Sequence, residues 1–178
     1  MSTTKSIVYI ALFAAMIAIG AWITIPCVPS PFTLQTFFCM LAGGLLGAKK
    51  GTISCLVYLA IGLVGLPVFT KGGGFQYVFQ PTFGYLLGLV PACFLAGFLL
   101  KKWKIHRFLG VYALFFCCSV LILVCGYLYY LLIIQPAPEA YWATFVSLFL
   151  IFVPAELLKS AASAFLYQNL KKYFAQSE

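Results

Sequence analysis

The sequence predicts an all-α polytopic membrane protein, and three features support this class. The 178 residues are 64% hydrophobic and only 8% charged, whereas soluble proteins have about 25% charged residues. The mean hydropathy is +1.07. Six apolar stretches follow one another, separated by short segments that hold nearly all of the charges. We therefore expect a single domain, residues 1–178, built from six transmembrane helices of about 20 residues each.

The charges and cysteines argue against several other classes of function. The formal net charge of +8 comes from short basic clusters between apolar stretches, a pattern that orients a membrane protein and does not indicate nucleic-acid binding. No G-x-x-x-x-G-K-[S/T] motif is present, so ATP hydrolysis would require a partner. The seven cysteines lack C-x-x-C spacing, and we interpret them as small buried apolar residues, with no metal and no cofactor.

The first predicted transmembrane helix covers residues 6–23 and carries a stripe of small residues. Ala11, Ala15 and Ala18 lie on one face, at i, i+4 and i+7. Small residues let another helix approach closely, so this face either packs within the bundle or docks onto a partner. The following segment, 24–31, contains three prolines and cannot be the interior of a helix, so we expect a stiff connector or a lid.

The next two predicted helices, 32–48 and 52–66, are joined by a basic turn at 49–51. Gln35 lies in the polar first turn of the earlier helix. Its amide both donates and accepts, which suits an amide-like ligand, a helix cap or a neighbouring side chain. The segment 67–81 contains three consecutive glycines, which disfavour a helix and allow a ligand or another helix to approach the backbone closely. A flexible loop is the simplest interpretation, and an anion site on its N–H groups is the alternative.

The fourth and fifth predicted helices, 82–100 and 108–134, flank the densest basic cluster, residues 101–107. Tyr85 lies near the start of the fourth helix, where it can present its ring and hydroxyl to a cavity. The fifth helix is aromatic-rich and long enough to cross a bilayer at a tilt.

The sixth predicted helix, 142–169, carries the feature on which the functional hypothesis depends. Glu156 and Lys159 are three residues apart and share one helical face, with no third charge in the surrounding apolar run. A charge at membrane depth costs about 2.5–3.5 kcal/mol on insertion scales and usually marks a functional site. Pro154 removes a helical hydrogen bond, which predicts a bend and a free carbonyl at Leu150. The pair indicates a site for a small polar molecule or, alternatively, an internal salt bridge that only fixes the helix.

The basic residues also predict the orientation of the chain. Of the 11 lysines and arginines, all except Lys71 and Lys159 fall on one side when six helices are threaded through a membrane. The positive-inside rule then places both termini in the cytoplasm. The proline-rich and glycine-rich loops share the external side, above Gln35, Tyr85 and the charged pair. We therefore expect a pocket that faces outward.

Four motifs, taken in order along the chain, resemble one known family. They are Pro31-Phe32-Thr33-Leu34-Gln35, Gly62-Leu63-Val64-Gly65-Leu66-Pro67-Val68-Phe69, Pro81-Thr82-Phe83-Gly84-Tyr85-Leu86 and Pro154-Ala155-Glu156-Leu157-Leu158-Lys159. The resemblance covers nearly the whole chain and is to the BioY family, the biotin-binding membrane subunits (S components) of energy-coupling factor transporters. It implies a six-helix bundle in the cytoplasmic membrane of a prokaryote that binds biotin from the external side and carries it inward without catalysis of its own.

The resemblance also implies partners and ligand contacts. Surrounded by membrane lipid, the alanine face of the first helix would dock onto a transmembrane coupling subunit driven by two ATPase subunits. Glu156 would accept hydrogen bonds from the ureido group of biotin, while Lys159 would clamp the valerate carboxylate or neutralise Glu156. The remaining implied ligand-binding residues are two glycines that allow close approach, one amide and three aromatic walls: Gly73, Gly74, Gln35, Phe32, Phe75 and Tyr85.

The chain departs from the family pattern at three places. Glu156 stands where the family has Asp, Leu86 stands where some relatives have Arg, and Gly72 or Gly73 replaces an Asn of some relatives.

Two other functions remain as alternatives. The first is a small membrane enzyme that acts on a lipid with Glu156 as base. No second carboxylate, metal-ligand cluster or Ser/His/Asp set lies in the predicted helices to support it. The second is a channel, which would need rings of like polar residues along several helices.

Overall fold

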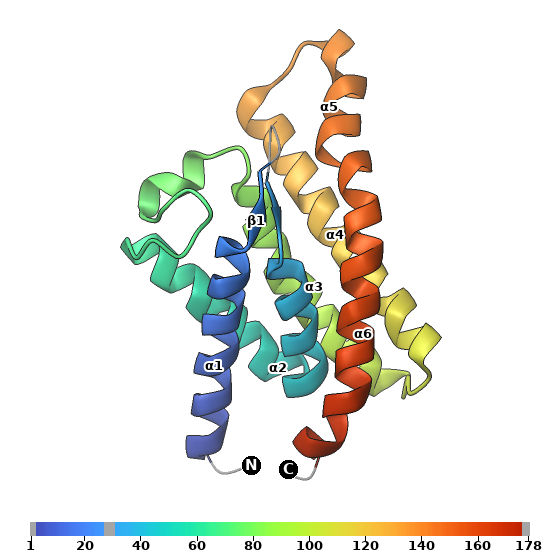
Figure 1. Ribbon diagram of the computed structural model, residues 1–178. Helices are drawn as coiled ribbons and strands as arrows, with labels where there is room; N and C mark the ends of the chain where they lie inside the picture. Colours follow the sequence, from blue (N-terminus) through green and yellow to red (C-terminus); the bar gives the residue numbers. More distant parts are fainter. Residues whose placement is uncertain (1–2, 27–30, 176–178) are drawn as a thin grey trace.

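The computed structural model describes residues 3–26 and 31–175, and it is a bundle of long helices with short connections (Figure 1). Five helical segments are long and apolar enough to cross a membrane. A helical protein with several candidate membrane spans, as predicted, is therefore confirmed. The helices are α1 (Thr3–Trp22), α2 (Gln35–Val64), α3 (Phe83–Lys102), α4 (Phe108–Ile134), α5 (Tyr141–Leu148) and α6 (Val153–Ala175).

Helix α2 is two helices joined at a sharp kink. Gly47 has φ 77° and ψ 173°, a backbone region that only glycine adopts readily. The Sγ atoms of Cys39 and Cys55 lie 3.8 Å apart, although residues so spaced on a straight helix would be about 24 Å apart. The halves on either side of Gly47 therefore run antiparallel, as Figure 1 shows. They correspond to the predicted helices 32–48 and 52–66. The turn expected at 49–51 was wrongly placed, because the chain reverses at the glycine and the lysines already belong to the next helix.

The last predicted helix is interrupted, and the interruption precedes the proline. Helix α5 ends at Leu148, a 3₁₀ turn (η3) covers Leu150–Phe152, and α6 begins at Val153. Pro154 is the second residue of α6, where its missing N–H leaves no intrahelical bond unmade. The expected free carbonyl at Leu150 was wrong, since it accepts from the Val153 N–H. The carbonyl of Leu148, just before the interruption, accepts a hydrogen bond from the Tyr85 hydroxyl of α3.

Small residues bring the neighbouring helices close together. A Cβ on Gly43 would lie 2.5 Å from the Cys93 carbonyl oxygen, which fixes the first half of α2 against α3. A Cβ on Gly88 would lie 3.0 Å from Cys125, which does the same for α3 and α4. This close packing of backbones is typical of helices in membranes. There the hydrophobic effect does not drive helices together, and association depends on van der Waals contact that small residues allow.

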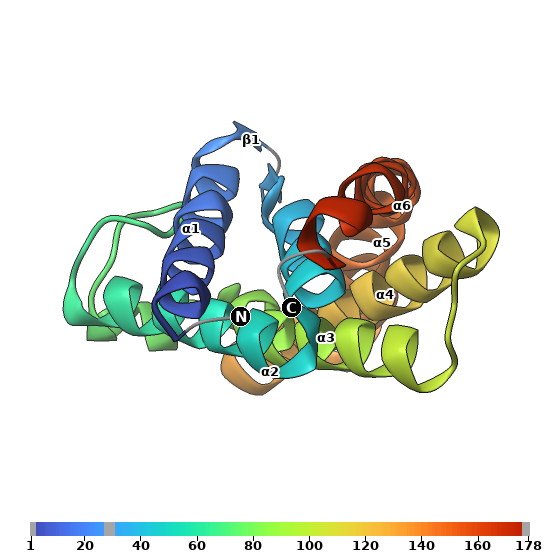
Figure 2. The same cartoon turned by 90° about the horizontal axis from the view of Figure 1, so that it is seen from below.

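Two connections cover one end of the bundle. The segment after α1 forms a short antiparallel pair, β1 (Thr24–Ile25) with β2 (Phe32–Thr33), a pairing that the sequence did not predict. Residues 27–30 of the proline-rich segment, expected as a connector or lid, lie outside the described residues. The glycine-rich segment contains a short 3₁₀ helix, η1 (Phe75–Phe79). Helix α1 starts and α6 finishes at the opposite end (Figures 1 and 2).

Candidate functional site

A cavity lies beneath these connections, between the first half of α2, α3, α4 and α6. Its volume is about 50 Å³, well below the roughly 300–1,000 Å³ of pockets that hold drug-sized ligands. The lining contains two charged side chains, a cluster of hydroxyls and an apolar floor: Pro31, Thr33, Gln35, Thr36, Thr70, Tyr77, Thr82, Tyr85, Leu86, Leu89, Ile122, Leu123, Phe152, Glu156 and Lys159. Four residues predicted from the sequence, Gln35, Tyr85, Glu156 and Lys159, thus meet in one place.

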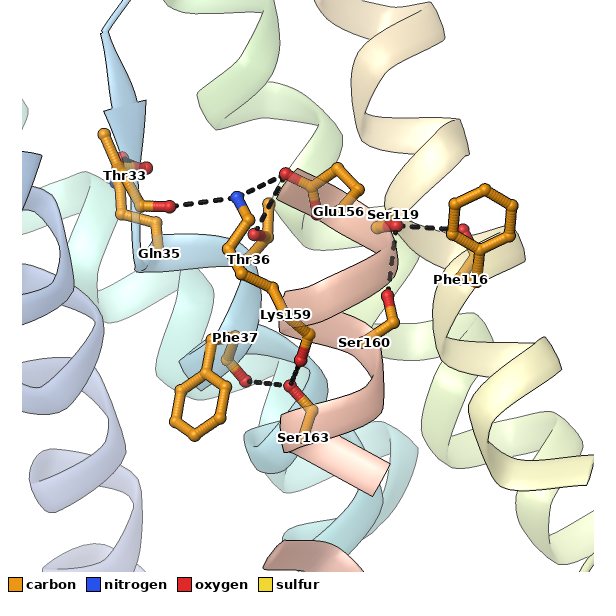
Figure 3. Close-up of polar contacts among 10 residues, drawn as sticks. All are labelled: Thr33, Gln35, Thr36, Phe37, Phe116, Ser119, Glu156, Lys159, Ser160 and Ser163. Atoms are coloured by element: carbon orange, nitrogen blue, oxygen red, sulfur yellow. Dashed lines mark hydrogen bonds and ion pairs between the residues drawn. The ribbon is translucent and has the colours of Figure 1, made fainter. Parts of the chain in front are cut away.

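The charged pair is the polar centre of this cavity. Lys159 forms an ion pair with Oε1 of Glu156, and its Nζ also donates to the Thr33 carbonyl at 3.0 Å (Figure 3). The Thr36 hydroxyl donates to the same Oε1 at 3.3 Å. Glu156 is 2% exposed and the Lys159 side chain 12%. Because Glu156 lies in the first turn of α6, the positive end of the helix dipole also favours its negative charge.

The second carboxylate oxygen of Glu156 has no donor. Oε2 is one of only two buried side-chain polar atoms in the described residues that lack a hydrogen-bond partner, the other being Thr52 Oγ1. A buried acceptor left unsatisfied costs about 1–3 kcal/mol, and more when it is charged. Such an atom beside a cavity indicates a ligand that brings an N–H or O–H donor.

Gln35 is held by its neighbours rather than left free. Its Nε2 donates to the Tyr58 hydroxyl at 2.8 Å, which in turn donates to the Val68 carbonyl at 3.2 Å. The Thr33 hydroxyl donates to Gln35 Oε1 at 3.1 Å. The bond to a neighbouring side chain, one of the roles left open for this amide, is therefore present. Since an amide oxygen accepts two hydrogen bonds, Oε1 still has one lone pair for a ligand.

Aromatic side chains form one wall of the cavity. The rings of Tyr85 and Phe152 are stacked with centroids 6.1 Å apart, and the Tyr85 hydroxyl donates to the Leu148 carbonyl at 2.7 Å. Phe32 packs on the far side of Phe152, at 4.3 Å between centroids, and so does not line the cavity. It lines an adjacent apolar groove of about 430 Å³, and Lys159 lies on the boundary of both spaces.

Three residues predicted as ligand contacts lie away from the cavity. Gly73 packs against the end of α2, where an added Cβ would be 2.0 Å from the Leu66 carbonyl oxygen. The Gly74 N–H donates to the Gly62 carbonyl at 2.7 Å, and Phe75 is 69% exposed. The glycines thus bring this loop close to α2.

Several lining residues were not predicted from the sequence. Thr36 belongs to the polar first turn that also holds Gln35, so its type and position carried a usable signal. Thr70 and Tyr77, whose hydroxyls lie 3.0 Å apart, are brought in by the glycine-rich segment. The sequence does not indicate that Phe152 lines the cavity, because its position depends on the break between α5 and α6.

A separate apolar groove of about 330 Å³ follows the alanine stripe of α1. Ala11, Ala15 and Ala18 line one side, and residues of the second half of α2, among them Tyr58, line the other. The Trp22 indole donates to the Pro67 carbonyl at 3.1 Å near one end. The stripe therefore borders a groove into which another helix could pack.

Three cysteines meet in the core. The sulfur atoms of Cys39, Cys55 and Cys93 lie within 4.8 Å of one another, and all three residues are fully buried. The expectation that no metal is bound here stays a prediction.

Comparison with known proteins identifies a family. The model of the BioY family matches residues 1–176. The chain is 40% identical to the "Probable biotin transporter BioY" of Lysinibacillus sphaericus, over 97% of this chain and 89% of that protein. It is 34% identical to the "Biotin transporter BioY" of Lactococcus lactis subsp. cremoris, over 94% of this chain and 91% of that protein.

A solved structure has the same fold. It is described as the "S-component for biotin from an ECF-type ABC transporter", and it matches with a TM-score of 0.86 and 31% identity, over 97% of this chain and 95% of that one. The four motifs, the helical architecture and both comparisons agree, and the chain belongs to the BioY family.

Proposed function

We propose that the chain binds biotin from the external side of the membrane and carries it inward as the substrate-binding subunit of an ATP-driven uptake system. The observation that carries this proposal is the buried Glu156, which lines the cavity and whose second oxygen has no hydrogen-bond donor among the described residues. The proteins that match over the whole chain are named as biotin transporters. The chain belongs to a family of transporters and not of enzymes, which argues against a lipid-modifying role for Glu156.

The chemistry of biotin suits this site. Its ureido ring offers two N–H donors, and Oε2 of the Glu156 carboxylate is an acceptor without a donor among the described residues. Hydrogen bonds to a charged partner are roughly twice as strong as neutral ones. The aromatic wall of Tyr85 and Phe152 and the apolar floor of the cavity suit the bicyclic thioether ring.

Binding requires side chains to move, because the cavity is only about 50 Å³. Lys159 lines both this cavity and the adjacent groove of about 430 Å³. Thr33 also lines both spaces, and a change in the rotamer of the flexible Lys159 side chain would join them. Phe32, which packs on Phe152 from the groove side, would then also border the enlarged pocket.

The contacts of Lys159 support the neutralising role. Its ammonium already pairs with Glu156 and donates to the Thr33 carbonyl, so its positive charge balances that of the carboxylate where water is scarce. The clamp on the valerate carboxylate stays as the second role, because Lys159 is also the only charged residue of 3–26 and 31–175 that lines the groove.

The same proposal includes six membrane crossings within a single domain, residues 1–178. The two antiparallel halves of α2 supply two crossings, and α5 with α6 supplies one. The basic residues near the ends of α3 and α6 lie at the end of the bundle where α1 starts. By the positive-inside rule this end faces the cytoplasm of a prokaryotic cell, in a multi-pass cell-membrane protein.

The proposed partners are a transmembrane coupling subunit and two ATPase subunits. The description of the solved relative, as part of an ECF-type ABC transporter, supports them. We place the coupling subunit in the groove beside Ala11, Ala15 and Ala18, because small residues let a second helix approach closely.

A thermal-shift experiment tests the function. Detergent-solubilised protein is heated with biotin, with lipoate or with thiamine. A ligand that binds only the folded state stabilises it by about 2.7 kcal/mol at 100 times its Kd. We expect a shift with biotin alone. Equal shifts with all three compounds, or none with biotin, would contradict the proposed function.

A further inference from the structure

A large basic cavity, which we call the basic basin, lies at the opposite end of the bundle from the biotin site. Its volume is about 890 Å³, and it is formed by the kink of α2, the end of α3 and the connection to α4. Its lining includes five lysines and one histidine: Lys49, Lys50, Lys101, Lys102, Lys104 and His106. A second cavity of about 430 Å³ shares His106 and adds two lysines of α6, Lys171 and Lys172.

No carboxylate from residues 3–26 or 31–175 lines the basin. The chain has three acidic residues. Glu156 lies in the biotin site, Glu139 lies in the turn before α5 at the other end of the bundle, and Glu178 is outside the described residues. Lys101, Lys102 and Lys104 of the basin therefore have no acidic side chain beside them in the part of the chain that the structure describes, and together they attract an anion.

The basin continues into apolar surface. Leu45, Leu46 and Leu100 share its lining with the lysines. Phe98 also lines it, is 41% exposed, and stacks on Phe94 one turn away, which is 42% exposed. These rings continue along the face of α3 away from the helix end. A ligand that fits has an anionic head and apolar chains that follow the helix.

Exposed aromatic and basic side chains place the basin at the surface of a bilayer. Trp103 follows the last residue of α3 and is 61% exposed, and tryptophan is enriched at membrane–water interfaces. The ammonium of Lys102 lies 5.6 Å from the centroid of the Phe98 ring. A positive charge and an exposed apolar ring therefore lie side by side, one helical turn apart on α3. This arrangement favours a lipid over a soluble anion or an acidic protein surface.

We propose that the basic basin binds the phosphodiester headgroup of an anionic phospholipid, with the acyl chains against the Phe94–Phe98 face. Basic pockets between transmembrane helices are suited to such headgroups. The proposal rests on the bundle spanning a membrane, and it is independent of biotin.

Native mass spectrometry tests this site with lipids that differ only in the headgroup. Detergent-solubilised protein is titrated with dioleoylphosphatidylglycerol or dioleoylphosphatidylcholine. We expect phosphatidylglycerol to bind at least about tenfold more tightly, since each lysine near an anionic lipid contributes about fivefold, the factor that corresponds to about 1 kcal/mol. Lys101→Gln should weaken phosphatidylglycerol binding about fivefold. The triple variant, which adds Lys102→Gln and Lys104→Gln, should weaken it roughly a hundredfold.

Lys71→Gln is the matched control. It removes the same charge from the glycine-rich loop, outside the basin, and should leave phosphatidylglycerol binding unchanged. The biotin-induced thermal shift of each variant reports that the fold is intact. Equal affinity for the two lipids, or equal losses for Lys71→Gln and Lys101→Gln, would overturn the proposal. So would binding of soluble glycerophosphoglycerol as tight as that of the lipid, because the acyl chains would then contribute nothing.

Discussion

Replacing Glu156 by glutamine removes the negative charge and preserves the shape of the side chain. The glutamine carbonyl can still accept from the Thr36 hydroxyl, which lies 3.3 Å from Oε1 of Glu156. The position of Oε2, which has no hydrogen-bond donor among the described residues, becomes an NH₂ group that cannot accept from a ureido N–H. The variant therefore tests the charged acceptor of the proposed biotin site that has no hydrogen-bond partner among the described residues.

The expected loss of affinity follows from the charge. A hydrogen bond to a charged group contributes about 1.5–3 kcal/mol, against about 1 kcal/mol for a neutral one. Replacing the charged acceptor by a donor should therefore weaken biotin binding by at least about tenfold, which corresponds to about 1.4 kcal/mol.

Stability falls as well, because Lys159 loses its anionic partner. Breaking a buried ion pair costs about 3–5 kcal/mol. The low end applies here, since Lys159 is 12% exposed and keeps its bond to the Thr33 carbonyl. Adding Lys159→Met removes the unpaired charge, so the double variant should recover part of the lost stability.

Isothermal titration calorimetry with biotin measures the affinity, and differential scanning fluorimetry measures the stability. Glu139→Gln, at the exposed turn before α5, is the matched control and should bind biotin normally. Glu156→Asp keeps the charge and should bind more tightly than Glu156→Gln. If folded Glu156→Gln bound biotin with unchanged affinity, the site would lie elsewhere.

Three further predictions concern the fold and the partner. Gly47→Ala and Gly47→Asn should both lose about 1–3 kcal/mol of stability in thermal unfolding, because the ψ of 173° excludes asparagine as well as alanine; normal stability of the asparagine variant would contradict this. Tyr85→Phe should lose about 1 kcal/mol by the same assay, as the bond to the Leu148 carbonyl disappears, and an unchanged midpoint would refute it. Ala15→Leu should abolish co-purification with the coupling subunit while biotin affinity persists. Leu12→Phe on the same helix, outside the groove, should have no effect, and equal co-purification of the two variants would refute the docking site.

Sequence reasoning located most of the helices because long apolar stretches separated by charges are a strong signal. The prediction for 108–134 coincides with α4, since Arg107 precedes its first residue and a Gln-Pro pair follows its last. The breaks inside helices were harder to locate. The kink at Gly47 depends on a backbone torsion, and the interruption at Phe149, with φ −123° and ψ −65°, has no glycine or proline at the break itself.

The site was only partly predictable for a related reason. Glu156, Lys159 and Gln35 are polar residues in apolar surroundings, so their chemistry alone makes them conspicuous. From the sequence alone, Phe152 cannot be distinguished from a phenylalanine that faces lipid. Gly73 and Gly74 were predicted to approach a ligand or, alternatively, another helix. Gly73 packs closely against the end of α2, and sequence alone cannot distinguish the two.

The side chains of Gln35 and Tyr58, joined by a hydrogen bond, lie between the α1 groove and the proposed biotin cavity. Tyr58 borders the α1 groove, and Gln35 borders the proposed biotin cavity. A helix inserted into the groove would contact the phenol ring, and a ligand in the cavity would contact the amide that donates to this phenol. Thermodynamic reciprocity requires any influence of the helix on the ligand to be matched by an equal influence in return.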